Sequence, residues 1–157
     1  SEQSDLRTRS SRPFLVCMSA MNGVSAESIK RSVRGFKGLS HRFETVDTVE
    51  GVEYIDDSKG TTVDSTYRAL ESCAKPVILI SGGKDKHSDY GRIRELIKKK
   101  TKHLILIGEA RDSIRSALAG AVDTRDAATL PEAVMTAASL AKRGDAIVLS
   151  PMCSSFC

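Results

Sequence analysis

Three short runs of aliphatic residues constrain the fold of this chain more than any other feature. The runs are Val77–Ile80, Leu104–Ile107 and Ala146–Leu149. A continuous apolar run of about four residues is typical of a strand buried on both faces, whereas a half-exposed strand alternates apolar and polar residues. The sequence therefore predicts at least three interior strands in a sheet that is covered on both sides.

Amphipathic stretches separate these runs and predict the helices that cover the sheet. They span about residues 62–73, 89–100, 110–118 and 130–142. Strands that alternate with helices of about ten residues form right-handed βαβ crossovers and a parallel sheet. The predicted fold is an open, Rossmann-like α/β domain, with a mostly parallel sheet and helices on both faces.

A hairpin signal precedes this pattern. Polar and apolar side chains alternate from Phe43 to Thr48, and Glu50-Gly51 separates this segment from the strand-like segment Val52–Asp57. Two short alternating segments around a glycine turn are typical of a β-hairpin. We therefore expect the α/β domain to span residues 41–157 and to begin with an N-terminal β-hairpin.

The residues before this domain have a different character. Residues 1–12 contain a single large apolar residue, Leu6, and are predicted to form a flexible arm, because they bury too little apolar surface to offset the entropy of ordering. Residues 13–40 predict two short helices. Because so few helical residues cannot enclose a core of their own, we interpret 13–40 as the remnant of a preceding domain.

Charge and composition exclude several classes of partner. The net charge of +4 is concentrated in residues 1–42, with 8 Lys or Arg against 3 Asp or Glu, while the remainder has 16 against 17. A near-neutral body with 4% aromatic residues is poorly suited to nucleic acid. The sequence contains neither a long apolar span nor a signal-peptide pattern, and its four cysteines form no C-x-x-C pair. We expect a cytoplasmic chain without nucleic-acid or membrane partners.

Polar residues gather directly after three predicted strands. They lie in Asp56–Thr62, Ser81–Asp89 and Ser150–Cys157. Ligands of open α/β sheets collect at the carboxyl ends of the strands, so these segments are expected to meet at one edge. They supply ammonium and hydroxyl groups suited to a small anionic ligand, namely Lys59, Thr61, Lys84, Lys86, Ser154 and Ser155.

Taken alone, each of these segments is more simply explained as a helix cap, with Ser58 or Thr61 capping one helix and Ser88 the next. Three such segments at one sheet edge favour the anion site instead. The chain has no P-loop motif, no G-x-G-x-x-G after a strand and no G-x-S-x-G. Its histidines do not have the spacing of a metal triad, so no metal site is predicted.

Several short motifs also follow one another in a specific order. They are Gly38–Glu44, Asp57–Thr61, Gly82–Lys86 with Asp89-Tyr90, Ile107–Ala110, Gly144-Asp145 and Leu149–Phe156. In this order they resemble the C-terminal domain of the Mur ligases, and within that family the D-glutamate-adding ligases. Each motif is weak by itself, but the ordered set is specific, and the resemblance covers about residues 14–156.

The resemblance implies an ATP-dependent, Mg²⁺-requiring ligase of peptidoglycan synthesis. In that reaction ATP phosphorylates the carboxylate of UDP-N-acetylmuramoyl-L-alanine, and the amine of D-glutamate attacks the acyl phosphate, which releases phosphate. The resemblance assigns D-glutamate binding to Thr61, Lys86, Ser155 and Phe156. It places Arg42 and Asp57 at the nucleotide, and it makes Lys59 the catalytic residue beside the transferring phosphate.

The sequence departs from the family in several ways. The P-loop central domain, whose last helices would correspond to residues 13–40, and the UDP-binding N-terminal domain are missing. Thr62 stands where Asn is usual, and Cys157 occupies the position of an Asp. We therefore expect a fragment or truncated gene product that is inactive alone, with ATP and Mg²⁺ bound mainly by the missing central domain.

Two alternatives stay open at this point. The chain could be a non-catalytic module that binds a small anion or another protein with the same fold. It could also belong to another amino-acid-adding Mur ligase or to a folylpolyglutamate-type ligase. The Gly82–Lys86 segment favours D-glutamate, because diaminopimelate or lysine carries an extra amine that would call for an acidic partner here.

Overall fold

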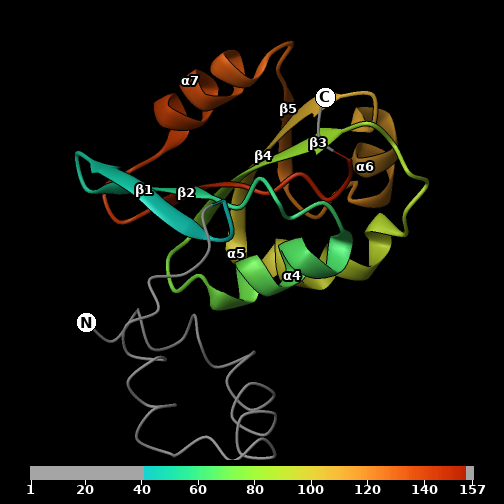
Figure 1. The fold of residues 1–157 in the computed structure, drawn as a ribbon, viewed down its shortest axis with the longest axis horizontal. Coiled ribbons are helices and arrows are strands. Elements are labelled where there is room, and N and C mark those ends of the chain that lie inside the picture. The colour runs from blue at the N-terminus through green and yellow to red at the C-terminus, as the bar shows by residue number, and fades with distance from the viewer. Residues whose placement is uncertain (1–40, 155–157) are drawn as a thin grey trace, which may run out of the picture. The chain divides into compact units, whose positions relative to one another are not determined.

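Six strands form one sheet in the order β1-β2-β6-β3-β4-β5 (Figure 1). The computed structural model describes residues 41–154, and the predictions for residues 1–40, Ser155, Phe156 and Cys157 lie outside this range. The strands are β1 (Glu44–Val49), β2 (Val52–Asp56), β3 (Val77–Gly83), β4 (Thr101–Gly108), β5 (Asp123–Asp126) and β6 (Ala146–Leu149). β1 is antiparallel to β2, and the remaining neighbours pair in parallel. The predicted Rossmann-like fold with an N-terminal hairpin is confirmed.

Helices cover both faces of the sheet, as predicted (Figure 1). One face carries α4 (Val63–Ser72), the 3₁₀ helix η1 (Tyr90–Ile93), α5 (Arg94–Lys100) and α6 (Arg111–Ala117), and the other carries α7 (Leu130–Leu140). The chain crosses the sheet in one direction from β2 through β3 and β4 to β5, and then returns to β6, which lies between β2 and β3. Because parallel crossovers are right-handed, the return places α7 on the opposite face.

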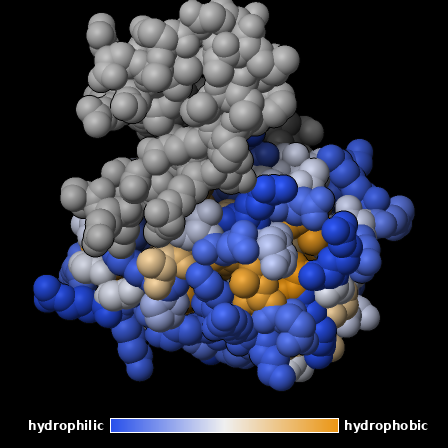
Figure 2. Space-filling model, turned by 90° about the horizontal axis from the view of Figure 1, so that it is seen from below, coloured by the Kyte–Doolittle hydropathy of each residue, from blue (hydrophilic) through white to orange (hydrophobic). Residues whose placement is uncertain are grey.

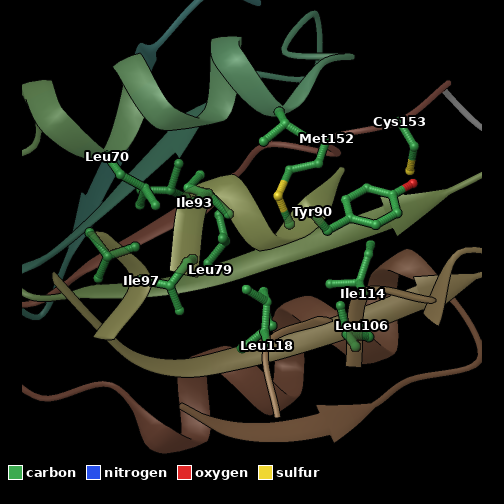
Figure 3. Close-up of a cluster of buried hydrophobic side chains, with 14 of the residues drawn as sticks. Leu70, Leu79, Tyr90, Ile93, Ile97, Leu106, Ile114, Leu118, Met152 and Cys153 are labelled. Atoms are coloured by element: carbon green, nitrogen blue, oxygen red, sulfur yellow. The ribbon is translucent and has the colours of Figure 1, made fainter. Parts of the chain in front are cut away.

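The three aliphatic runs form the centre of this sheet. Alternate side chains of each run enter separate clusters, so that Leu79 and Leu106 lie on the α4 side and Ile80 and Ile107 on the α7 side. On the α4 side, Leu70, Ile93, Ile97, Ile114 and Leu118 cover the sheet (Figure 3). Each fully buried aliphatic side chain contributes about 1.5–3 kcal/mol, so the strand runs and the helix residues that cover them together stabilise the core.

The helices on the α4 side turn their polar faces outward. Val63, Ala69 and Leu70 of α4 are buried, whereas Asp64 and Glu71 are exposed. Seen from the side on which α4 and α5 lie, most of the surface is hydrophilic, with a smaller hydrophobic area (Figure 2). Among residues 41–154 no helix has both the length and the apolar character needed to cross a membrane.

Helix boundaries correct several predictions from the sequence. Thr62 caps α4, since its hydroxyl accepts from the Ser65 N–H and the Ser65 hydroxyl in turn accepts from the Thr62 N–H, which is a capping box. Asp89 rather than Ser88 caps η1. The predicted helix at 89–100 is a 3₁₀ turn followed by a short α-helix, and its last residue, Lys100, donates to the Cys73 carbonyl at the end of α4.

Two strand predictions were also incomplete. β3 does not end at Ile80 but continues to Gly83, because Ser81, Gly82 and Gly83 pair with β4. β5 was not predicted, since its four residues are charged or polar and mostly exposed. It is an edge strand that pairs with β4 alone, so its residues need no second buried face.

Candidate functional site

The register of the parallel strands brings the predicted loops to one edge of the sheet. Asp56 of β2 and Ile80 of β3 both pair with Leu149 of β6. Residues Asp57 and Ser150 therefore lie one step beyond the paired level. The Asp57 N–H donates to the Leu149 carbonyl at 2.8 Å, and the Ser150 N–H donates to the Ile80 carbonyl at 3.0 Å.

A buried chain of hydrogen bonds links three elements at this edge. The hydroxyls of Thr66 in α4 and Ser150 after β6 lie 2.6 Å apart, and the Ser150 hydroxyl donates to Asp57 Oδ2 at 2.8 Å. The Phe43 N–H donates to Asp57 Oδ1 at 3.1 Å. Burial raises the pKa of Asp57 above its ordinary value, although the bonds from Ser150 and Phe43 oppose this effect. Both carboxylate oxygens thus hold protein groups in place.

The turn after Asp57 lies directly against the segment that follows β6. A Cβ at Gly60 would collide with Asp57 Oδ2 and lie 2.6 Å from Ser150 Oγ, so only glycine fits there. The Gly60 carbonyl accepts from the Met152 N–H at 3.0 Å. Met152 is fully buried and has a φ of 62°, an uncommon conformation for a side chain of its size, which its surroundings must hold.

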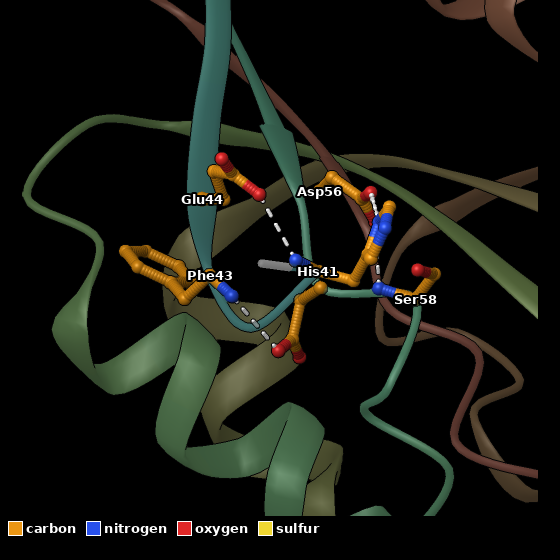
Figure 4. A network of polar contacts seen from close by, with 6 residues as sticks. His41, Phe43, Glu44, Asp56 and Ser58 are labelled. Carbon is orange, nitrogen blue, oxygen red and sulfur yellow. Dashed lines mark hydrogen bonds and ion pairs between the residues drawn. The ribbon is translucent and has the colours of Figure 1, made fainter. Parts of the chain in front are cut away.

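A second network joins His41, Asp56 and Ser58 beside the start of the hairpin (Figure 4). His41 Nδ1 lies 2.6 Å from Asp56 Oδ2, and Asp56 Oδ1 accepts from the Ser58 N–H at 2.8 Å. The Lys59 N–H donates to the His41 carbonyl at 3.2 Å. Burial favours a higher pKa for Asp56, but the bonds from His41 and Ser58 outweigh it and lower the pKa. The Lys59 side chain itself is exposed.

The loop after β3 is tied to the same segment after β6. The Gly82 N–H donates to the Pro151 carbonyl at 3.0 Å, and the Lys84 N–H donates to the Ser154 carbonyl at 3.1 Å. Cys153 is buried between these contacts, and burial together with the charge of Asp85 raises the pKa of its thiol to about 11. Its thiol therefore stays protonated and behaves as a core residue.

The structure places five of the predicted site residues at this edge. Arg42, Asp57, Lys59 and Thr61 lie around the β2 end, and Lys86 lies on the loop after β3. Among these Asp57 is buried, whereas the side chains of Arg42, Lys59 and Lys86 are exposed. Lys59 and Thr61 precede the capping residue of α4, so they do not belong to its first turn.

Sequence reasoning missed the residues that support this edge. They are Thr66, Ser150, His41, Asp56 and Asp85. The sequence held a partial signal for Asp56, Asp85 and Ser150, which belong to the three polar segments at strand ends, but none for Thr66 in the interior of a helix. Within residues 41–154 no group of three or more His, Cys, Asp or Glu residues could hold a metal ion.

A family model described as the glutamate ligase domain of the Mur ligases matches residues 41–153, which is the whole of this sheet and its edge. The chain belongs to the Mur ligase family. The UDP-N-acetylmuramoylalanine–D-glutamate ligase of Geotalea daltonii is 47% identical over 136 residues, which are 87% of this chain and 30% of that protein. The ligase of the same name from Desulfosudis oleivorans is 45% identical over 134 residues, or 85% of this chain and 29% of that protein. This Mur ligase chain thus spans about 30% of the length of these relatives.

Solved structures agree on the fold. The MurF ligase of Thermotoga maritima in complex with ADP superposes with a TM-score of 0.65 at 12% identity, over 87% of this Mur ligase chain and 32% of that chain. The bifunctional folylpolyglutamate synthase/dihydrofolate synthase of Yersinia pestis gives a TM-score of 0.62 at 14% identity, over 82% of this chain and 32% of that chain. Identities this low show a shared fold alone.

Proposed function

We propose that the chain is the amino-acid-binding C-terminal domain of an ATP-dependent ligase that adds D-glutamate to UDP-N-acetylmuramoyl-L-alanine in peptidoglycan synthesis. The observation that carries the proposal is the 47% identity to a D-glutamate ligase over 136 residues, which are 87% of this chain. The basic side chains and hydroxyls at that edge suit an acidic amino acid. Because its substrates are nucleotides and nucleotide-linked precursors, the proposal includes a cytoplasmic location.

Each basic residue has a distinct role in this proposal. Lys86 and Thr61 bind the carboxylates of D-glutamate, together with Ser155 and Phe156. Lys59 lies near the transferring phosphoryl group, where a positioned cation stabilises the charge that develops in the transition state. Arg42 binds the nucleotide. We also assign Asp57 to the nucleotide-binding region. Its main role there is to hold the surrounding backbone in place, since both its oxygens accept hydrogen bonds from this domain.

The nucleotide and the metal ion fit the domain to different degrees. Exposed Arg42 and Lys59 suit the phosphates of ATP. The residues from 41 to 154 offer no ligand set for Mg²⁺. We therefore propose that Mg²⁺, and most of ATP, bind to the part of the longer relatives that this chain does not span, and we assign no step to the metal here.

The acidic residue that adjoins Lys86, Asp85, supports D-glutamate as the substrate. Diaminopimelate or lysine would bring a second ammonium group, which requires an available carboxylate. Asp85 already accepts hydrogen bonds at both oxygens, from His87, Tyr90 and Ser113. It therefore serves the loop rather than an additional ligand amine.

Ligand titration of the ¹⁵N-labelled chain by NMR tests the proposal. We expect D-glutamate to shift the amides of Lys59, Thr61 and Lys86 with a dissociation constant near or above ~1 mM, because ordering binding residues costs about 1–2 kcal/mol each. L-lysine and diaminopimelate should produce smaller shifts. Lys86→Ala should weaken the response, whereas Lys98→Ala, an exposed lysine of α5, is the matched control.

A different pattern of shifts would contradict the proposal. If L-lysine or diaminopimelate shifts the Lys86 loop as strongly as D-glutamate does, the chain does not select an acidic amino acid. If D-glutamate shifts residues on another part of the domain and Lys86→Ala has no effect, the sheet edge is not its binding site.

A further inference from the structure

One carboxylate anchors the loop that carries Lys86. Asp85 Oδ1 accepts from the His87 N–H at 2.8 Å and from the Tyr90 hydroxyl at 2.9 Å, and Oδ2 accepts from the Ser113 hydroxyl at 2.6 Å. His87 Nδ1 lies 3.9 Å from Oδ2. These donors belong to the loop itself, to η1 and to α6, so a single side chain joins three elements.

The bond to His87 determines the backbone course at Lys86. It closes a turn in which the Asp85 side chain binds the N–H two residues later, with Lys86 in the middle. His87 has a φ of 53°, in the left-handed region that non-glycine residues adopt rarely. A side-chain acceptor at the start of such a turn stabilises this conformation. The direction of Lys86 therefore depends on Asp85.

The other two bonds connect this turn to the rigid part of the domain. Tyr90 is 2% exposed, and its ring belongs to the same buried cluster as Ile114 and Met152 (Figure 3). Ser113 lies in α6, whose start is fixed to the end of β3 by the bond from the Ala110 N–H to the Gly83 carbonyl, at 3.0 Å. Asp85 thus positions the turn relative to the hydrophobic core.

Asp85 directly precedes Lys86, which would bind a dicarboxylate. The negative charge of Asp85 would repel such a ligand unless protein groups compensate it. Hydrogen bonds from Ser113, His87 and Tyr90 lower the pKa of Asp85, so the carboxylate is ionised and its charge is directed to protein donors. The pKa values of Tyr90 and Cys153, which both lie nearby, are raised by burial, so neither adds a negative charge.

From these contacts we propose that Asp85 is a positioning residue for the amino-acid substrate, which fixes Lys86 and sets the affinity for the acidic ligand. This inference rests on the function proposed above. It requires that donors remote from the ligand, Ser113 above all, influence binding through Asp85. A side chain that merely stabilises the fold would not have this effect.

Ser113→Ala tests the inference without disturbing the core, since Ser113 is exposed on α6 and alanine favours a helix. We expect it to raise the pKa of Asp85, which is measured from the ¹³C carboxyl shift as a function of pH. We also expect it to move the Lys86 amide signal. It should weaken D-glutamate binding by about two- to tenfold, because part of the free energy of the lost bond is coupled to the loop conformation that binds the ligand. Ser113→Thr, which keeps the hydroxyl, should restore all three values. Ser116→Ala, on the same helix, should change none of them.

Other results of these measurements would contradict either the inference about Asp85 or the proposed function. A higher pKa of Asp85 in Ser113→Ala with unchanged D-glutamate affinity would overturn the inference while leaving the proposed function intact. If the unmodified chain does not respond to D-glutamate at any position, the proposed function fails. The Lys86 amide signal in Ser113→Ala is then the remaining readout. An unmoved signal would overturn the inference, because it would show that the anchoring of Asp85 to α6 through Ser113 does not position Lys86.

Discussion

Replacing Ser150 by alanine should destabilise the domain through a single buried oxygen atom. Ser150 is fully buried, and its hydroxyl lies between Asp57 Oδ2 at 2.8 Å and Thr66 Oγ1 at 2.6 Å. Alanine removes only the hydroxyl, but it leaves both neighbours with one partner fewer. The bond to a charged group contributes about 1.5–3 kcal/mol and the neutral one about 0.5–1.5 kcal/mol, so we expect a loss of about 2–4.5 kcal/mol.

The loss should depend on pH in a defined direction. Burial raises the pKa of Asp57 above 3.8, and the bond from Ser150 is the largest effect that lowers it. Without this bond the pKa of Asp57 in the folded state rises further, so the folded variant binds the proton more tightly than the folded parent. Its stability relative to the parent therefore decreases as pH rises through these values. The destabilisation should be larger at about pH 7.5 than at about pH 4.5.

Urea unfolding at both pH values measures this effect, and Ser81→Ala provides the matched control. Ser81 is also fully buried, but its hydroxyl donates to a neutral acceptor, the Pro151 carbonyl, at 2.8 Å. Its replacement should cost about 0.5–1.5 kcal/mol at either pH. If Ser150→Ala costs no more than Ser81→Ala, or if its cost does not change with pH, the charged bond to Asp57 does not contribute as described.

The remaining predictions concern the proposed site and the core. In a complete ligase that contains this domain, Lys86→Ala should mainly raise the KM for D-glutamate, by about 10–100-fold, and Lys59→Ala should mainly lower kcat; equal effects of both changes on both parameters would contradict these roles. The chain alone, mixed with ATP, Mg²⁺ and both substrates, should release no phosphate. Among the described residues Thr101 Oγ1 is the buried side-chain polar atom without a partner. Thr101→Val should therefore raise the melting temperature by about 2–4 °C, measured by calorimetry, and a decrease would contradict this assignment.

The sequence predicts the centre of the sheet because an apolar run such as Leu104–Ile107 is too short for a buried helix and lies between amphipathic helical stretches, which indicates an interior strand. Successive side chains of such a strand point to opposite faces of the sheet, and all of them are buried. This requires a neighbouring strand on each side and a helical layer on each face. The edge strand β5 follows no such rule. Its register with β4 includes the pair His103 and Asp123, whose side chains lie 3.0 Å apart, and it contributes little buried apolar surface.

The candidate site likewise has a part that the sequence predicts and a part that it does not. Its loops are predictable because the carboxyl ends of parallel strands share one edge, and this placed Lys59 and Lys86 together. The side chains that support these loops are not predictable from local patterns. Thr66 and Ser150 are separated by 84 residues, and Asp85 and Ser113 by 28 residues. Such contacts depend on how α4 and α6 pack against the sheet, which no short motif encodes.

The segment Ser150–Ser154 joins the two halves of the proposed site. It bonds to the Asp57–Gly60 turn through Ser150 and Met152, and to the end of β3 and its loop through Pro151 and Ser154. A displacement of this segment would therefore move the Lys59 and Lys86 loops together, whereas each lysine affects its own half. In the complete ligase, at a temperature where the variant is folded, Ser150→Ala should raise the KM for D-glutamate and lower kcat at once. A change confined to one of these parameters would show that the segment supports only one loop, since a shared support cannot shift one contact set and spare the other.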